Sequence, residues 1–441
     1  MIVHAHPLLQ GPLRPGWQLS TVDAIKASEK HSCVAGPFGS SISSKFFVEA
    51  GVPIIRGSNL SMSLDRFICK DFAFISKDTA DKFTAQTVSA NDLVFTCWGT
   101  IGQVGIIPAN GPFKSYVISN KQLKLRVNCK IVDPLYAYYF FACPETVQYI
   151  RDRAIGSAVP GINLGILKAL PVLVPPPEEQ RRIISILGAY DDLIEVNRQR
   201  VALLEDMARG LFEEWFVRFR FPGHEAVAIV DTADGPLPEG WAWKTIGDVT
   251  SYVNRGLAPK YDETSSSLVI NQKCIRDQRL SFQHARKQSK AVPADKVLRP
   301  GDILINSTGV GTLGRVAQAE EVSEGLTVDS HVTIVRPLFE ADRDFLGMQL
   351  LRLQPLFEDM GTGATGQTEL SRSAVSALSI TWPTQKFREA FGKQARPIRT
   401  LVSTLMDANA RLAASRDLLL PRLISGQLSV ADAERELQEA A

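Results

Sequence analysis

The sequence lacks the features that mark membrane and secreted proteins. Its longest purely apolar run, residues 135–143, falls far short of the roughly 20 residues that a membrane-spanning helix needs. Residues 1–7 show no basic segment leading into an apolar one. We therefore expect a cytoplasmic protein without a membrane span.

Metal-binding and disulfide patterns are also missing. The 6 cysteines are widely separated and form no Cys-x-x-Cys pair, and the 6 histidines show no ligand spacing. We expect buried thiols, and we predict neither a metal site nor a cofactor in this chain.

Neither sign of charge dominates. The 49 Lys and Arg residues nearly balance the 47 Asp and Glu residues, for a net charge of +2, which excludes a polybasic chain. A length of 441 residues with 45% hydrophobic residues predicts two or three packed domains.

The chain contains an internal repeat at an offset of about 210 residues. Residues 92–95 (DLVF) and 99–104 (GTIGQV) reappear as residues 302–305 (DILI) and 311–316 (GTLGRV). Each copy combines short β-branched runs with one or two helices, such as 134–153, where Asp133 caps the helix and Pro134 takes its first position. We therefore predict an α+β fold with two similar domains.

The hydrophobic period changes after each copy, which sets the predicted boundaries. The expected layout is a first domain over 1–174, a first long helix over 175–221, a connection over 222–240, a second domain over 241–382, a second long helix over 383–426 and a C-terminal tail over 427–441.

Each predicted long helix carries a heptad seam with alternating spacings of four and three. The first seam comprises Ile183, Leu187, Tyr190, Ile194, Asn197, Val201, Leu204, Ala208, Leu211 and Trp215. The second comprises Phe387, Phe391, Gln394, Ile398, Leu401, Leu405, Ala408, Leu412, Ser415 and Leu419. Because a long helix cannot bury such a seam alone, we expect the two helices to pair; the alternative is that each packs only on its own domain.

Three residues modify these seams. Asn197 and Gln394 are polar seam positions that can fix the register of the pair. Pro397 removes a backbone donor inside the second helix, so we expect a kink there.

Catalytic patterns are weak. Residues 309–314 match G-x-G-x-x-G, but no helix with an apolar stripe follows before Gly325, so a glycine-rich turn between strands is favoured over a nucleotide site. His331 stands beside Asp329, yet its repeat partner is Lys121, which favours binding or structure over proton transfer.

Basic and polar loop residues are the candidates for binding duplex DNA through two separated domains. In the first domain they are Lys45, Arg56, Ser58, Asn59, Lys114, Ser115, Asn120 and Lys121. In the second they are Lys273, Arg276, Arg279, Arg286, Lys287, Lys290, Ser330 and His331. The alternative is that these charges form an ordinary solvated face.

Three motifs make the sequence resemble the specificity subunits of type I restriction-modification systems over essentially its whole length. They are residues 36–41 (GPFGSS) with 53–59 (PIIRGSN), residues 176–183 (PPEEQRRI) at the start of the first long helix, and residues 415–426 (SRDLLLPRLISG) at the end of the second.

The resemblance implies two target recognition domains, separated by two helices that form an antiparallel coiled coil. Each domain would read half of a bipartite DNA target. It also implies a non-catalytic chain that docks two DNA methyltransferase subunits, with restriction subunits added in the full complex. S-adenosylmethionine, ATP and Mg²⁺ would then belong to those partners. Residues 383–387 (PTQKF) depart from the family's helix opening.

Two other functions stay open at this point. A coiled-coil assembly or regulatory protein would use the duplicated domains to bind proteins instead of DNA. An enzyme would bind a nucleotide at residues 309–314.

Overall fold

The structure, a computed structural model, describes residues 6–9, 11–39, 41–156, 160–361 and 369–440, with side chains described as far as residue 435. Its contacts divide the chain into two units, one of residues 1–197 with 407–441 and one of residues 198–406. Each unit thus contains one globular domain and part of both long helices, whereas the sequence-based layout had set the helices apart from the domains.

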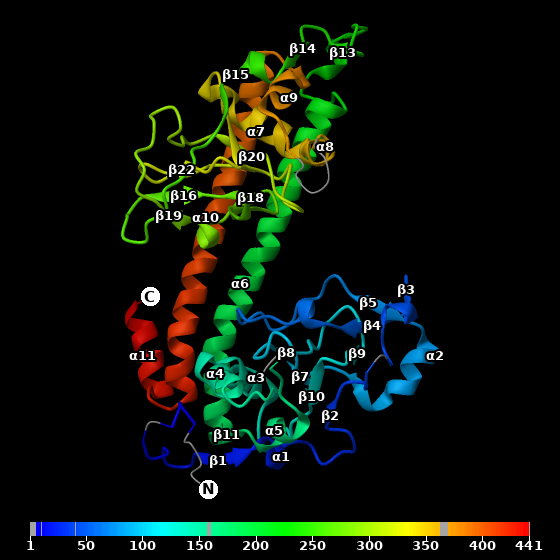
Figure 1. The fold of residues 1–441 in the computed structure, drawn as a ribbon, viewed down its shortest axis with the longest axis vertical. Coiled ribbons are helices and arrows are strands. Elements are labelled where there is room, and N and C mark those ends of the chain that lie inside the picture. The colour runs from blue at the N-terminus through cyan, green and yellow to red at the C-terminus, as the bar shows by residue number, and fades with distance from the viewer. Residues whose placement is uncertain (1–5, 10, 40, 157–159, 362–368, 441) are drawn as a thin grey trace. The chain divides into compact units, whose positions relative to one another are not determined.

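The first domain contains two sheets and a short strand pair (Figure 1). One sheet has the order β2-β10-β7-β8, with bounds Cys33–Ala35, Gln122–Leu125, Leu93–Thr96 and Val104–Ile106. The other has the order β3-β5-β4-β9-β6, with bounds Phe47–Val48, Ala73–Ile75, Val52–Ile55, Tyr116–Ile118 and Thr87–Val88. Strand β1 (Gln18–Thr21) pairs with β11 (Pro171–Val174).

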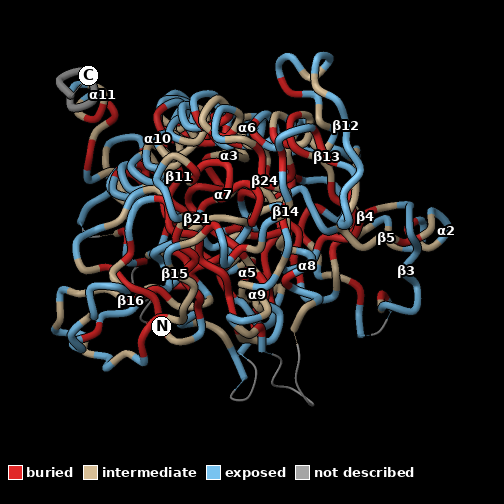
Figure 2. The backbone as a smooth tube through the Cα atoms, turned by 90° about the horizontal axis from the view of Figure 1, so that it is seen from above, coloured by how far each residue is buried: buried red, intermediate tan, exposed pale blue. Residues whose placement is uncertain are grey.

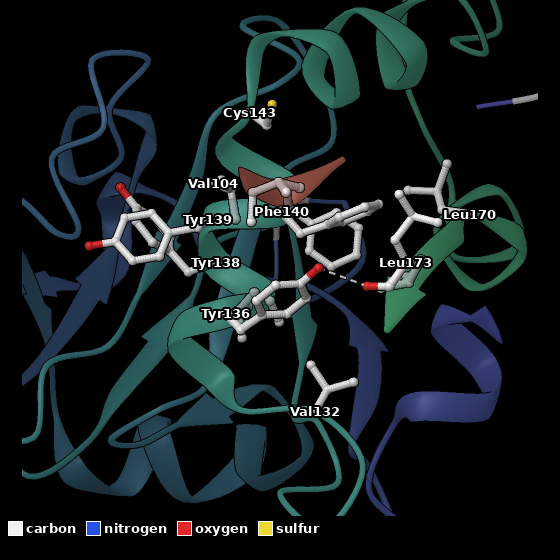
Figure 3. Packing of buried hydrophobic residues seen from close by; sticks show 14 of the residues in the cluster. Val104, Val132, Tyr136, Tyr138, Tyr139, Phe140, Cys143, Leu170 and Leu173 are labelled. Atoms are coloured by element: carbon white, nitrogen blue, oxygen red, sulfur yellow. Dashed lines mark hydrogen bonds between the residues drawn. The ribbon is translucent and has the colours of Figure 1, made fainter. Parts of the chain in front are cut away.

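Helix α3 (Pro134–Ala142) forms the centre of the first domain's core. Asp133 caps it by accepting the Leu135 N–H at 2.8 Å, and Pro134 occupies its first turn, which confirms the predicted start. Its aromatic side chains are buried, and the Tyr136 hydroxyl donates to the Leu173 carbonyl at 3.0 Å (Figure 3). The domain's other helices are α1 (Val22–Ile25), α2 (Lys77–Ala80), α4 (Pro144–Arg151) and α5 (Leu164–Ala169).

The second domain repeats this arrangement. Its four-stranded sheet has the order β15-β23-β20-β21, with bounds Thr250–Arg255, Val332–Pro337, Ile303–Asn306 and Val316–Gln318. Its smaller sheet has the order β19-β16-β22, with bounds Arg286–Lys287, Leu268–Ile270 and Thr327–Val328. The remaining elements are β14 (Ala242–Thr245), which pairs with β24 (Ser379–Trp382), the hairpin β17 (Ile275–Arg276) and β18 (Arg279–Leu280), and helices α7 (Arg343–Arg352), α8 (Gln354–Asp359) and α9 (Arg372–Ala377).

The two four-stranded sheets follow the same strand order along the chain, and each domain contains one parallel strand pair, β4 with β9 and β16 with β22. This confirms the α+β fold with two similar domains. The same ion pair occurs in both copies of the sequence repeat. Asp92 accepts from Arg126 at 2.7 Å in the first domain, and Asp302 accepts from Arg336 at 2.8 Å in the second, with both carboxylates buried.

Figure 2 colours the backbone by burial: buried residues gather in the cores of the domains, and exposed residues are frequent in the loops. Two cysteines depart from the expectation of buried thiols, because Cys69 and Cys129 are exposed. The other four are buried.

The long helices α6 (Pro177–Phe212) and α10 (Gln385–Ile424) run antiparallel and pair in both units. In the first unit, the Asn197 amide donates to the Asn409 side-chain oxygen at 2.9 Å, and Arg416 pairs with Asp191 at 2.6 Å. In the second unit, the Phe391 ring packs against Phe212 with centroids 5.6 Å apart. The helices therefore pair with each other as well as packing on the domains.

The structure places the first seam on the inner face of α6 and of the π-helical turn that follows it. Buried or half-buried members are Ile183, Leu187, Tyr190, Ile194, Asn197, Val201, Leu204, Ala208, Leu211 and Trp215. A π-helical turn at Glu213–Val217 follows the helix.

The second seam is partly shifted. Of its predicted members, Phe387, Phe391, Ile398, Leu405, Ala408, Leu412 and Leu419 are buried or half-buried. Leu401 is 46% exposed, and Gln394 and Ser415 are also exposed, so these assignments are wrong. The inner face instead passes through Ala395, Val402, Asn409, Arg416 and Leu423. This heptad row was missed in the sequence because it contains Asn409 and Arg416, and polar residues are usually assigned to the surface.

The structure also reports on three further expectations, which concern the tail, the connection and Pro397. Residues 427–441 are not simply a tail, because helix α11 (Val430–Ala440) follows α10, and Leu428, Val430 and Ala433 are buried in the first unit's core. The connection 222–240 contains a short hairpin of β12 (Ile229–Val230) and β13 (Leu237–Pro238). Helix α10 continues through Pro397 without a break.

A buried cluster around Asp191 joins the first domain to both helices. The Asp191 carboxylate accepts from Arg416 of α10 at 2.6 Å, from the Tyr139 hydroxyl at 2.5 Å and from Arg66 at 3.2 Å. Burial and the negative charge of Asp191 raise the pKa of Tyr139, so its hydroxyl stays protonated and donates.

We predict that Asp191→Ala destabilises the first unit by about 3–5 kcal/mol, because it leaves the buried Arg416 guanidinium without its main partner. The matched control is Asp192→Ala, which removes an exposed partner of Arg66 and should cost less than about 1 kcal/mol. Hydrogen exchange of the α10 amides would measure both; equal protection in the two variants would contradict the prediction.

Candidate functional site

Each domain brings four loops together at one edge, which we call the four-loop edge. In the first domain it comprises residues 36–39, 56–58, 97–100 and 119–121, which follow β2, β4, β7 and β9. In the second it comprises residues 256–258, 271–273, 307–311 and 329–331, which follow β15, β16, β20 and β22.

Backbone hydrogen bonds hold the first edge around the turn after β9. The Ser119 N–H donates to the Ile55 carbonyl at 3.2 Å, and the Cys97 N–H donates to the Lys121 carbonyl at 2.8 Å. The Gly36 N–H donates to the Gln122 carbonyl at 2.8 Å. Because β4 and β9 are parallel, both strands deliver their following residues to this edge.

The second edge is held in the same way around the turn after β22. The Asp329 N–H donates to the Ile270 carbonyl, and the Ser307 N–H donates to the His331 carbonyl, both at 2.8 Å. The Gly256 N–H donates to the Val332 carbonyl at 3.1 Å.

Close backbone approach explains a glycine in each edge. A Cβ on Gly36 would lie 1.9 Å from the Ser119 carbonyl oxygen, and one on Gly256 would lie 2.0 Å from the Val328 carbonyl oxygen. Only glycine therefore lets these loops pack against the central turn.

Several predicted DNA-binding residues lie on the edges. In the first domain they are Arg56, Ser58, Asn120 and Lys121, and in the second they are Lys273, Ser330 and His331. The Arg56 guanidinium donates to the Asp71 carbonyl at 2.7 Å, and the Asn120 amide donates to the Gly39 carbonyl at 2.8 Å. The His331 Nδ1 lies 2.7 Å from the Thr308 hydroxyl.

The edges favour an anionic partner. Among the residues that define them, the sole acidic one is Asp329, which is buried and accepts the His331 N–H at 2.9 Å. Burial raises the pKa of Asp329 above its usual value. Arg56, Lys121 and Lys273 are exposed cations.

Other candidates lie elsewhere. Asn59 is fully buried: its side chain accepts the Arg56 N–H and donates to the Ile68 and Lys70 carbonyls, so it is structural. Lys114 and Ser115 precede β9 and lie at the opposite end of that strand from Lys121. Lys45 lies on the short 3₁₀ helix Ser44–Phe46, with its ammonium over the Phe46 ring.

The other basic candidates of the second domain fall outside the residues that define the edge, and most of them have partners within the domain. Arg279 forms a two-pronged ion pair with Glu205 of α6 at 2.7 and 2.8 Å, so its charge is already matched. Arg276 lies on the same hairpin, exposed beside Asp277. Arg286 stacks on the Tyr261 ring, and Lys287 and Lys290 donate to the Glu263 and Ala258 carbonyls.

Sequence reasoning missed the apolar side chains of the edges. Phe38 is 95% exposed, Val310 is 87% exposed and Trp98 is 41% exposed. The sequence did contain a signal for them, because each lies beside or between glycines. A large apolar side chain in a glycine-rich loop has few neighbouring side chains to bury it, so exposure could have been predicted.

The fold does not support the alternative of a nucleotide site at residues 309–314. Residues 309–314 connect the antiparallel strands β20 and β21, and no helix follows them. A Cβ on Gly314 would lie 2.4 Å from the Glu358 nitrogen, so this glycine packs against α8. This confirms the glycine-rich turn between strands.

Comparison with known proteins points to one group of relatives. Residues 39–206 match the model of the type I restriction modification DNA specificity domain. The MjaIX specificity subunit of Methanocaldococcus jannaschii is 24% identical over 408 residues, which cover 90% of this chain and 91% of that protein. The chain is therefore similar to type I restriction-modification specificity subunits over most of its length, and residues 39–206 match their DNA specificity domain.

Other specificity subunits are similar to this chain over comparable lengths. The HindI specificity subunit of Haemophilus influenzae is 24% identical over 403 residues, with 73% of this chain and 85% of that protein covered. The solved S subunit from M. genitalium matches with a TM-score of 0.58 at 14% identity and covers 95% of this chain and 99% of that chain, which supports the fold. No described helix is long and apolar enough to cross a membrane.

We predict that Asn59→Ala destabilises the protein by about 2 kcal/mol or more, because the fully buried Asn59 side chain makes three hydrogen bonds to backbone groups. The neighbouring Ser58→Ala, at an exposed edge position, should change stability by no more than about 0.5 kcal/mol. Urea denaturation would compare them, and equal midpoints would show that Asn59 is not structural.

Proposed function

We propose that this chain is a specificity subunit that reads a bipartite duplex DNA target, with one half of the target at each four-loop edge. The observation that carries the proposal is the repeated edge itself, in which four loops with exposed Arg, Lys, Ser and Asn side chains surround a rigid turn. Cations would bind phosphates, while polar side chains would read base edges in the major groove.

The residues of the four-loop edge can change between subunits without disturbing the fold. The edge residues lie in loops, while the strands and the buried Asp–Arg pairs hold the domain together. Different subunits could therefore carry different loop residues on one scaffold, and each domain would read its half independently of the other.

We further propose that the helices dock two DNA methyltransferase subunits and that restriction subunits join the full complex. Helix α6 carries an outward stripe of exposed apolar residues, in which Leu203 and Met207 are 64% and 60% exposed. Leu193 and Val196 continue the stripe at helical spacing. Such a stripe suits burial by a partner subunit.

The chemistry would lie with the partners. S-adenosylmethionine for methyl transfer, and ATP with Mg²⁺ for the restriction activity, would be bound by those subunits, and we propose no cofactor for this chain. The paired helices would set the spacing and rotational phase of the two half-sites, which lie on the same face of the duplex when they are about 34–36 Å apart.

The proposal predicts that Lys121→Ala weakens DNA binding and reduces the salt dependence of the binding constant by about 0.9 per lost phosphate contact. Lys114→Ala is the matched control, because Lys114 lies at the other end of β9. Binding would be measured at several salt concentrations with the complete methyltransferase complex. Equal effects of the two changes would contradict the placement of DNA at the edge, and no sequence-selective binding by the unaltered complex would favour the protein-binding alternative.

A further inference from the structure

The first edge presents a phenylalanine that the fold does not bury. Phe38 is 95% exposed, although its loop is fixed on both sides. Gly36 packs against the Ser119 carbonyl, the Asn120 amide binds the Gly39 carbonyl at 2.8 Å, and the Ser41 hydroxyl donates to the Phe38 carbonyl at 2.7 Å. The backbone is thus held while the ring remains in solvent.

The second edge presents Val310 in a similar way, from a different loop. Val310 is 87% exposed at the tip of a turn between Gly309 and Gly311, which have positive φ angles of 109° and 71°. The Thr312 N–H donates to the Gly309 carbonyl at 3.1 Å, and the Arg315 guanidinium donates to the Gly311 carbonyl at 2.7 Å. This turn therefore also holds an apolar side chain in solvent.

Neither side chain contributes to a hydrophobic cluster of its domain. A solvated phenyl or isopropyl group gains free energy when an apolar surface covers it. The neighbouring cations, Arg56 and Lys121 in the first domain and Lys273 in the second, point to a polyanion as the covering partner.

Duplex DNA offers one apolar group that identifies a base in the major groove, the C5-methyl group of thymine. We propose that Phe38 and Val310 each contact a thymine methyl group, one in each half of the target. This inference rests on the proposed function and adds a specificity-determining contact to each edge, beside the hydrogen bonds that the polar residues provide.

The test first determines the methylated motif of a host that carries the subunit with its methyltransferase. Duplexes are then prepared in which single thymines of the motif are replaced by uracil, which removes only the methyl group. Binding of these duplexes is measured with the complete complex that contains the unaltered chain, Phe38→Ala or Val310→Ala.

For the unaltered chain, uracil at one thymine of each half should weaken binding about fourfold, the value of one buried methyl group. In Phe38→Ala, the same replacement in the first half should have no further effect, while the second half stays sensitive. Val310→Ala should show the reverse. Phe47→Ala, a partly exposed position on β3, is the control and should keep both sensitivities.

Three results would overturn the inference. One is a half-site without thymine, another is full uracil sensitivity retained in both variants, and the third is a Phe38→Ala complex with unchanged affinity and motif. Each of these leaves the proposed function intact, because the complex would still bind a bipartite sequence. A complex without any sequence-selective binding would overturn both.

Discussion

The parallel pairing of two short strands in each domain is the interaction on which both candidate sites depend. Ile55 aligns with Ile118 in the first domain and Ile270 with Val328 in the second. Because parallel strands end at the same edge, the residues after them meet there. Strands β7 and β20 of the four-stranded sheets add their loops to the same place through the Cys97–Lys121 and Ser307–His331 backbone hydrogen bonds. Without this pairing the basic and apolar loop residues would be dispersed.

The helix pair adds a second constraint, and its charges differ between the two copies. Asp191 and Arg399 stand at the same distance from the first residues of α6 and α10. Asp191 pairs with Arg66 of the first domain, whereas Arg399 pairs with Glu320 of the second. The two domains therefore share a topology but contact their helices through opposite charges at these positions.

The sequence predicted the architecture well because its signals are repetitive. The offset between Asp92 and Asp302 revealed the duplication, and that between Arg126 and Arg336 supported it, since each repeat keeps the same buried ion pair. The first helix seam was equally readable. In the second seam, one of the two heptad rows was predicted one residue too early. Asn409 and Arg416 of the true row face inward through hydrogen bonds, which no hydrophobic pattern reveals.

The candidate site was less predictable, because charge alone does not show where a side chain points. Arg279 and Lys121 are both basic loop residues, yet one pairs with Glu205 and the other lies on the edge. Asn59 and Ser58 are adjacent, yet only Asn59 is buried. The distinction depends on strand pairing, which a single sequence without strand order does not give.

The central claim is that each domain reads its own half of the target. Its most direct test replaces residues 1–174 with the corresponding domain of a relative that has another target, keeping an arginine opposite Asp191. Sequencing of methylated DNA from a host with the methyltransferase then reports the motif. The account predicts that one half of the motif changes and the other stays the same; a change in both halves, or in neither, would contradict it.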